Sequence, residues 1–144
     1  MVTESRTPLR VRYGEVDRMG IAYYAHYLDW FTEGRTDLLR QAGIAYREVE
    51  EQGLLLPVLR AACRYHRPAG YDEQIEIVTS ASISPTRLRC DYRLERAGTL
   101  LADGFTEHAF VRAKDMRPVN AERHFPEIFA HFRHLPPYRS AQRD

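Results

Sequence analysis

The pattern of apolar and polar residues predicts one long helix, over residues 24–42. Apolar side chains recur there at spacings of three and four, so they share one face of the helix, and polar side chains take the other. The apolar set consists of Tyr24, Tyr27, Leu28, Phe31, Leu38, Leu39 and Ala42. Gly43 follows where a left-handed C-terminal cap is expected. At 1.5 Å per residue the helix would be about 28 Å long, and a sheet must cover its apolar face.

The rest of the chain predicts mainly strands, because apolar and polar residues alternate there with a period of two. The expected strands cover residues 9–13, 59–66, 75–83, 87–95 and 99–111. Short helices are expected at residues 45–52 and 126–132. One strand before the long helix and a four-strand antiparallel meander after it predict an α+β architecture, with the sheet packed on the helix.

Length and composition predict one globular domain. The 144 residues fit a single domain, 1–144, with flexible tails at 1–6 and 136–144. Hydrophobic residues make up 44% and charged residues 28% of the chain, as is usual for a soluble protein. No stretch has the apolar core of a signal peptide or the length of a membrane span, so we expect a cytoplasmic location and no membrane partner.

Charge and cysteine usage argue against several other partners. The net charge of +1 gives no global field that would attract nucleic acid or an anionic membrane. No CxxC or HxxxH cluster occurs, so we expect no metal and no bound cofactor. Cys63 and Cys90 fall on expected strands, where a free cysteine is usually a small core residue.

Candidate chemistry lies at the start of the long helix, where no Ser, Thr, Asp or Asn stands at the cap position. The first backbone N–H groups are then free to polarise a carbonyl oxygen, helped by the helix dipole. Asp17 lies a few residues upstream, on a loop that Gly20 allows to turn sharply. Its carboxylate could attack such a carbonyl or activate a water. The structural alternative is that Asp17 caps the first turn or closes an Asx-turn.

A family resemblance covers residues 11–39, which read VRYGEVDRMGIAYYAHYLDWFTEGRTDLL. This stretch resembles the opening of the 4-hydroxybenzoyl-CoA thioesterase family, acyl-CoA thioesterases with the hotdog fold. The matching positions are Arg12, Tyr13, Glu15, Asp17, Gly20, Tyr23, Tyr24, Tyr27, Leu28, Trp30, Phe31 and Arg35. Weaker similarity continues through residues 65–72, 102–110 and 117–118. Many relatives carry His where this chain has Tyr24 and Asn where it has His26, so the acid–base role of that His is open here.

The resemblance implies a hotdog fold and the hydrolysis of an acyl-CoA thioester to a carboxylic acid and free CoA. It implies Asp17 and Tyr24 as catalytic residues, with Asp17 as nucleophile or general base. The N–H groups around Tyr23, Tyr24 and Ala25 would hold the carbonyl oxygen. The expected substrate-binding residues are Gly20, Ile21, Tyr23, Ala25 and Tyr27. The resemblance also implies a homodimer or homotetramer with the active site between subunits, and CoA as part of the substrate.

Other charged residues have two interpretations each. Arg87 and Arg89, on the outward side of their strand, suit the phosphates of CoA, or form cross-strand ion pairs. Glu33 lies on the polar helix face and is the rival to Asp17, because hotdog thioesterases of another branch use a carboxylate on the central helix. Arg35 falls on the apolar stripe and is expected to pair with Glu15 or another acid, or to lie at a seam.

Three alternatives to a thioesterase stay open. A non-catalytic acyl- or CoA-binding hotdog module would bind its ligand without turnover. A hotdog dehydratase would share the fold, but its chemistry requires a His paired with an acid, and this chain has Tyr24 where relatives carry His. Nucleic-acid binding through the Arg-bearing strand is disfavoured, because no aromatic residues alternate with Arg on that face.

Overall fold

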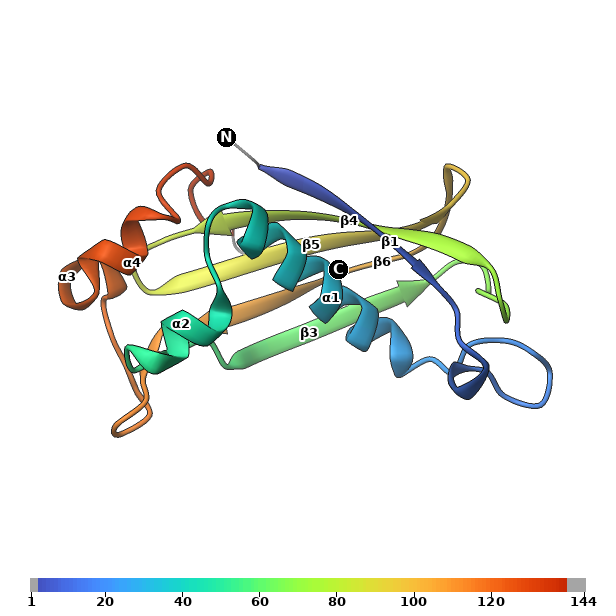
Figure 1. The fold of residues 1–144 in the computed structure, drawn as a ribbon, viewed down its shortest axis with the longest axis horizontal. Helices are drawn as coiled ribbons and strands as arrows, with labels where there is room; N and C mark the ends of the chain where they lie inside the picture. Colours follow the sequence, from blue (N-terminus) through green and yellow to red (C-terminus); the bar gives the residue numbers. More distant parts are fainter. Residues whose placement is uncertain (1–2, 140–144) are drawn as a thin grey trace.

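The long helix is α1, His26–Gln41, and it lies across one face of an antiparallel sheet in the computed structural model (Figure 1). The structure describes residues 3–139. Five strands form the sheet in the order β1-β4-β5-β6-β3. Their bounds are Glu4–Arg10 for β1, Val58–Tyr65 for β3, Gln74–Ile83 for β4, Arg87–Arg96 for β5 and Thr99–Ala109 for β6. This confirms the expected α+β hotdog arrangement of one long helix on a five-stranded sheet.

Shorter elements occupy the two ends of the sheet. A small second sheet joins β2 (Leu54–Leu55), β7 (Val111–Arg112) and β8 (Arg117–Pro118). The short helices are the 3₁₀ turn η1 (Tyr13–Glu15), α2 (Tyr46–Glu51), α3 (Ala121–His124) and α4 (Pro126–Ala130). α2 and α4 confirm the two short helices expected, whereas α3 was not predicted. Figure 1 shows α3 and α4 at one end of the sheet and residues 11–25 at the other.

The first strand begins earlier than its alternation suggests. It was expected at residues 9–13, but β1 starts at Glu4 and ends at Arg10, where the chain turns into η1. The expectation failed because small polar residues sit on the inner side of β1. Ser5, for example, is only 2% exposed opposite Thr79 of β4. Polar residues in these positions hide the period of two.

The tails are shorter than expected within the part of the chain that the structure describes. Glu4–Arg6 pair with β4, so a flexible tail at 1–6 is wrong for these residues. The Tyr138 N–H donates to the Ile83 carbonyl at 2.8 Å, and the Arg139 N–H donates to the Ser82 hydroxyl at 3.1 Å. These bonds attach residues 136–139 to the end of β4. Residues 1–2 and 140–144 lie outside the described residues.

The predicted four-strand meander is wrong, because β3 does not pair with β4. It pairs with β6 in the register Ala61↔Thr106 and Tyr65↔Ala102, and so forms the edge of the sheet opposite β1. Only β4, β5 and β6 follow one another as a meander. The connection from β3 to β4, residues 66–73, therefore carries the chain across the sheet at the end where α1 starts.

The core lies between α1 and the inner face of the sheet, the face that the helix covers. The residues of β5 buried there are Leu88, Cys90, Tyr92 and Leu94, as their alternation predicted. Phe31 of α1 stacks flat on Tyr92, with ring centroids 4.5 Å apart. The predicted helix face is partly wrong: Trp30 is 2% exposed, whereas Tyr24 and Leu28 are 62% and 39% exposed. The inward side of α1 is thus rotated toward Trp30.

Among the described residues, no helix is long and apolar enough to cross a membrane.

Gly34 allows α1 to approach β4 closely. A Cβ atom at this position would overlap Oγ1 of Thr79 and lie 2.8 Å from Cγ2 of Ile77, both in fully buried residues. Gly34→Ala is therefore expected to lower the free energy of unfolding by about 1–3 kcal/mol, the usual cost of overpacking, although Ala is the better helix former. Urea denaturation would measure this. Gly14→Ala is the matched control, because no atom lies within 4 Å of its added Cβ; equal losses in both variants would contradict the prediction.

Candidate active site

Asp17 sits in a tight loop, residues 16–22, that we call the Asp17 loop. Its main chain closes the loop, since the Asp17 N–H donates to the Ile21 carbonyl at 3.0 Å. Its side-chain Oδ1 accepts the Met19 N–H at 2.8 Å and the Ile21 N–H at 3.4 Å. Asp17 thus does close an Asx-type turn, as the structural alternative held. Oδ2, however, has no hydrogen-bond partner among the described residues, and the side chain is exposed. One carboxylate oxygen fixes the loop while the other is free for chemistry.

Backbone contacts dock the Asp17 loop on the segment after β3. The Ala22 N–H donates to the Ala69 carbonyl at 2.8 Å, and the Tyr71 N–H donates to the Gly20 carbonyl at 3.0 Å. Gly20 has a φ of +76°, a conformation that glycine adopts without strain. The position of the loop is therefore set mainly by main-chain hydrogen bonds.

Glu15 ties the Asp17 loop to the first half of α1. Its buried carboxylate accepts Trp30 Nε1–H at 2.8 Å and the Arg12 N–H at 2.7 Å. Burial alone would raise the pKa of Glu15, but these hydrogen bonds outweigh it and hold the pKa below its usual range, so the group stays ionised. The predicted pairing of Arg35 with Glu15 is wrong, because Trp30 occupies that place. Arg35 instead donates to the Tyr92 hydroxyl at 3.2 Å.

The start of α1 lacks a side-chain cap, as the sequence predicted. Ala25 is the N-cap and offers no side-chain acceptor. In the part of the chain that is described, the N–H groups of Tyr24 and Ala25 have no hydrogen-bond acceptor. The Tyr23 N–H is not free, since it donates to the Glu15 carbonyl at 2.9 Å. The expectation that Tyr23 supplies a free N–H is therefore wrong, and two donors with the helix dipole behind them are left.

A hollow of about 340 Å³ opens between the Asp17 loop and the end of β3. Its lining residues are Ile21, Ala22, Tyr24, Tyr27, Tyr65, His66, Arg67 and Pro68. The Tyr65 hydroxyl donates to the Tyr24 carbonyl at 2.8 Å and so joins β3 to the start of the helix. Asp17 borders the hollow, because its Oδ1 accepts the N–H of the lining residue Ile21. The free carboxylate oxygen, the two free N–H groups and the hollow belong to one region.

The structure brings some predicted site residues together and separates others. Ile21, Tyr24 and Tyr27 line the hollow, whereas Gly20, Tyr23 and Ala25 lie beside it in the chain without lining it. No role in the site was predicted from the sequence for Tyr65 or for Arg67. The signal that was present is the weaker family similarity over residues 65–72, a stretch that contains both Tyr65 and Arg67.

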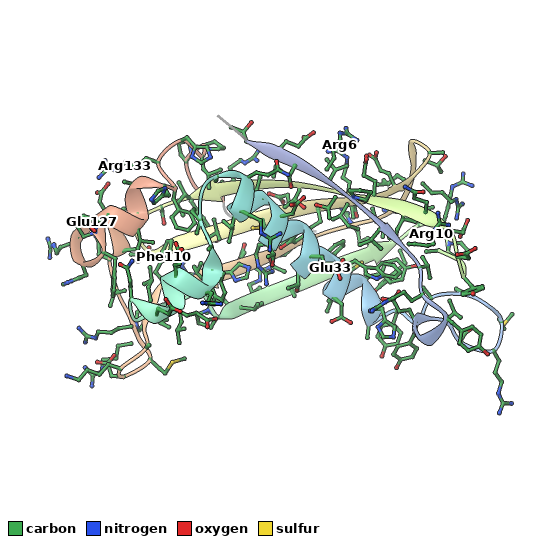
Figure 2. The ribbon with its side chains drawn as sticks, in the orientation of Figure 1. Arg6, Arg10, Glu33, Phe110, Glu127 and Arg133 are labelled. Atoms are coloured by element: carbon green, nitrogen blue, oxygen red, sulfur yellow. The ribbon has the colours of Figure 1, made fainter. Side chains whose placement is uncertain are left out.

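The remaining candidates lie away from the hollow. Arg89 alternates with the buried residues of β5, so it lies on the outer face, where it bonds Asp91 and Glu107 at 3.0 and 2.9 Å. Arg87 is on the same outer side. Neither is brought together with Asp17. Glu33 is exposed on α1 (Figure 2). The side chain of His26 is held by Asp29, with Nδ1 and Oδ2 3.2 Å apart.

Comparison with known proteins identifies the family. The sequence profile of the thioesterase-like superfamily matches residues 11–130. The chain belongs to this superfamily. Acyl-CoA thioesterase YbgC of Haemophilus influenzae is 32% identical over 131 residues, covering 89% of this chain and 93% of that protein.

Solved structures agree with this membership of the thioesterase-like superfamily. The crystal structure of DHNA-CoA thioesterase from Staphylococcus aureus has a TM-score of 0.86 and 28% identity, covering 91% of this chain and 89% of that one. A hypothetical protein of Thermus thermophilus, TT1821, has a TM-score of 0.84 and 32% identity, covering 94% and 99%. The resemblance seen in the sequence is confirmed at the level of the superfamily. Membership of the narrower 4-hydroxybenzoyl-CoA thioesterase family stays a prediction.

Proposed function

We propose that this chain hydrolyses an acyl-CoA thioester to a carboxylic acid and free CoA. It is a thioester hydrolase by its family, whose relatives carry acyl-CoA thioesterase names. The observation that carries the proposal is the free Oδ2 of Asp17 beside an uncapped helix start and an aromatic hollow. A carboxylate and preorganised N–H donors are sufficient in principle for a thioester, because the thiolate is a good leaving group.

In the proposed mechanism the thioester carbonyl oxygen accepts the N–H groups of Tyr24 and Ala25. These donors and the helix dipole stabilise the negative charge that develops on this oxygen. Asp17 Oδ2 then acts in one of two ways. As general base it takes a proton from the attacking water, and that proton passes to the departing CoA thiolate. As nucleophile it forms a mixed anhydride with the acyl group while the thiolate leaves, and water then hydrolyses the anhydride.

We propose that the hollow receives the acyl group, with Ile21, Tyr24 and Tyr27 in contact with it. The Tyr27 and Tyr65 rings meet edge to face at 4.8 Å, which supports an apolar, partly aromatic lining. Tyr24 stands where many relatives carry His, and we retain its hydroxyl as the candidate acid–base group. Gly20, Tyr23 and Ala25 would act through the main chain that shapes the loop and the helix start.

The binding site for the CoA nucleotide stays a prediction. Arg87 and Arg89 were predicted for its phosphates, but they lie on the outer face and Arg89 already bonds two carboxylates. Arg67 is an exposed cation that lines the hollow itself. We propose Arg67 as the first phosphate contact, because a guanidinium suits phosphate oxygens.

Assembly and location also belong to the proposal. β3 pairs only with β6 among the described strands, so its other edge has free backbone groups that a second copy could pair with. This supports a homodimer or a homotetramer. We propose a cytoplasmic enzyme that needs no cofactor, since CoA enters as part of the substrate, and that acts on neither nucleic acid nor membranes.

A panel of short, long and aromatic acyl-CoAs tests the proposed function. Release of free thiol, measured with a chromogenic disulfide, is expected for at least one of them with the wild-type protein. Tight binding of acyl-CoA without thiol release would favour the non-catalytic module. Loss of water from a 3-hydroxyacyl-CoA, with the thioester intact, would favour the dehydratase. Either result would contradict the proposal, and parallel assays of acyl-carrier-protein thioesters would show which carrier the enzyme prefers.

A further inference from the structure

Arg35 is a half-buried cation without a counter-ion among residues 3–139. Its guanidinium donates to the Tyr92 hydroxyl at 3.2 Å, and it forms no ion pair with any carboxylate among the described residues. Arginine side chains that leave solvent are usually paired with an acid. Arg89 shows the usual pattern in this same chain, with Asp91 and Glu107 beside it. The missing partner of Arg35 therefore requires an explanation.

Tyr92, Thr106 and His108 form a hydrogen-bond chain that ends at Arg35, and every donor in it has its acceptor on the side of His108. His108 Nδ1 lies 3.0 Å from the Leu56 carbonyl, which can only accept, so Nδ1 carries the proton. His108 Nε2 therefore accepts from the Thr106 hydroxyl at 2.8 Å. Thr106 in turn accepts from the Tyr92 hydroxyl at 2.7 Å. The Tyr92 oxygen is left to accept from Arg35, so this chain holds the guanidinium in place but brings no negative charge.

The titratable groups around Arg35, which are His108, Cys90 and Tyr92, are neutral near pH 7. Burial lowers the pKa of His108 to about 4, so its imidazole is uncharged. Burial raises the pKa of the Cys90 thiol to about 12 and raises the pKa of Tyr92 above its usual range. Within the described part of the chain, no group that contacts Arg35 therefore balances its positive charge.

Arg35 lies on the inner face of the sheet, farther along β3 than the hollow. The residues of β3 between the two places are incompletely covered by α1. The register runs from Tyr65↔Ala102 at the hollow through Cys63↔Gly104 to Ala61↔Thr106. Four residues of strand correspond to roughly 13 Å. The residues of β3 on this path are incompletely covered: Ala61 is exposed, Cys63 is half-buried and Tyr65 is 46% exposed. These incompletely covered residues form a strip that extends along β3 from the hollow to the position opposite Thr106, which belongs to the hydrogen-bond chain that ends at Arg35.

We infer that Arg35 is a specificity residue that binds an anionic oxygen, such as a carboxylate, at the far end of the substrate's acyl group. The inference rests on the proposed function, since it places the thioester at Asp17 and the acyl group on the strip. A guanidinium fixed from behind by Tyr92 presents its other N–H groups as a fork, which suits the two oxygens of a carboxylate. The preferred substrates are then thioesters of dicarboxylic acids.

The test compares adipyl-, suberyl- and sebacyl-CoA with the same compounds blocked as ω-methyl esters. The wild type is expected to have the higher kcat/KM for the free acid of at least one chain length. In Arg35→Met the ratio of acid to ester should fall by roughly 10- to 100-fold, the scale of a hydrogen bond to a charged group. Arg35→Lys should retain part of the ratio, because it keeps the charge and loses the fork. Arg40→Met, on the exposed side of α1, is the matched control and should keep the wild-type ratio.

Binding of the free diacids gives a readout that does not depend on turnover. Calorimetry with adipate, suberate and sebacate should show binding to the wild type and to Arg40→Met, and weaker binding to Arg35→Met. Thermal melting establishes that each variant is folded. An unchanged acid-to-ester ratio in Arg35→Met, or an equal fall for acid and ester, would overturn the inference. So would dissociation of an oligomer in Arg35→Met without a change in ratio, because Arg35 would then pair with a second copy of the chain.

The proposed function and this inference fail in different ways. If ester substrates are hydrolysed but Arg35→Met leaves the ratio and diacid binding unchanged, the thioesterase function stands and the inference is wrong. If no acyl-CoA is hydrolysed, the proposed function is wrong, and diacid binding alone decides the role of Arg35.

Discussion

Asp17→Asn is expected to lower kcat for thioester hydrolysis by about 100-fold or more, the scale for loss of a general base or nucleophile. The substitution is conservative for the loop, because the Asn amide oxygen can still accept the N–H groups of Met19 and Ile21 that Oδ1 accepts now. What it removes is the negative charge and the free oxygen. Thiol-release kinetics on the best acyl-CoA of the panel would measure the effect, with thermal melting to show an intact fold.

Glu33→Gln is the control for this prediction. Glu33 is a carboxylate on the exposed face of α1, and on sequence grounds it was the alternative to Asp17 for the catalytic role. Its loss is expected to leave kcat within a few-fold of wild type. If Asp17→Asn stays active while Glu33→Gln is inactive, the catalytic role belongs to the helix carboxylate and our mechanism is wrong.

Acidification from pH 7 to pH 5 is expected to lower the free energy of unfolding by about 2 kcal/mol through His108 alone. The pKa of this side chain is about 4 in the folded protein against 6.5 for a free histidine. Between these values the unfolded chain binds a proton that folded His108 does not. Stability is therefore lost as the pH falls below 6.5. Urea denaturation at half-unit steps would show the slope.

His108→Leu should remove most of this slope, even though it also lowers stability at pH 7 by leaving the Leu56 carbonyl without its donor. His124→Gln removes an exposed histidine and should keep the wild-type slope. Above pH 5, Glu15 does not contribute to the pH dependence of the free energy of unfolding. Its pKa is lowered by folding, so its contribution is present above the usual glutamate range and is lost only at more acid pH. A slope that survives in His108→Leu would contradict the assignment.

The elements with a regular period were predictable from sequence, and those held by polar contacts were not. α1 and β5 were found because their buried sides repeat strictly. β1 was misplaced because Ser5 faces inward and breaks the pattern. The pairing of β3 with β6 could not be predicted either, because alternation shows which side of a strand is buried but not which strand lies next to it.

The site was predictable as far as local chemistry determines it. The uncapped helix start and the turn at Asp17 follow from residues close together in the chain. The capture of the Tyr23 N–H by the Glu15 carbonyl also lies within this stretch, but it depends on a backbone path that no residue pattern specifies. Tyr65 and Arg67 reach the hollow only because the chain crosses the sheet after β3. The isolation of Arg35 is a tertiary fact, because Trp30 takes the Glu15 carboxylate that Arg35 was expected to bind.

The docking of the Asp17 loop by main-chain hydrogen bonds has an evolutionary consequence. Arg18 and Met19 expose their side chains on this loop while the backbone holds Asp17 in place. Substitutions at these two positions can therefore alter what the protein contacts beside its active site without moving the carboxylate. Such a loop can accumulate changes under selection for new acyl groups, because the reacting group and the variable surface are supported by different atoms of the same few residues.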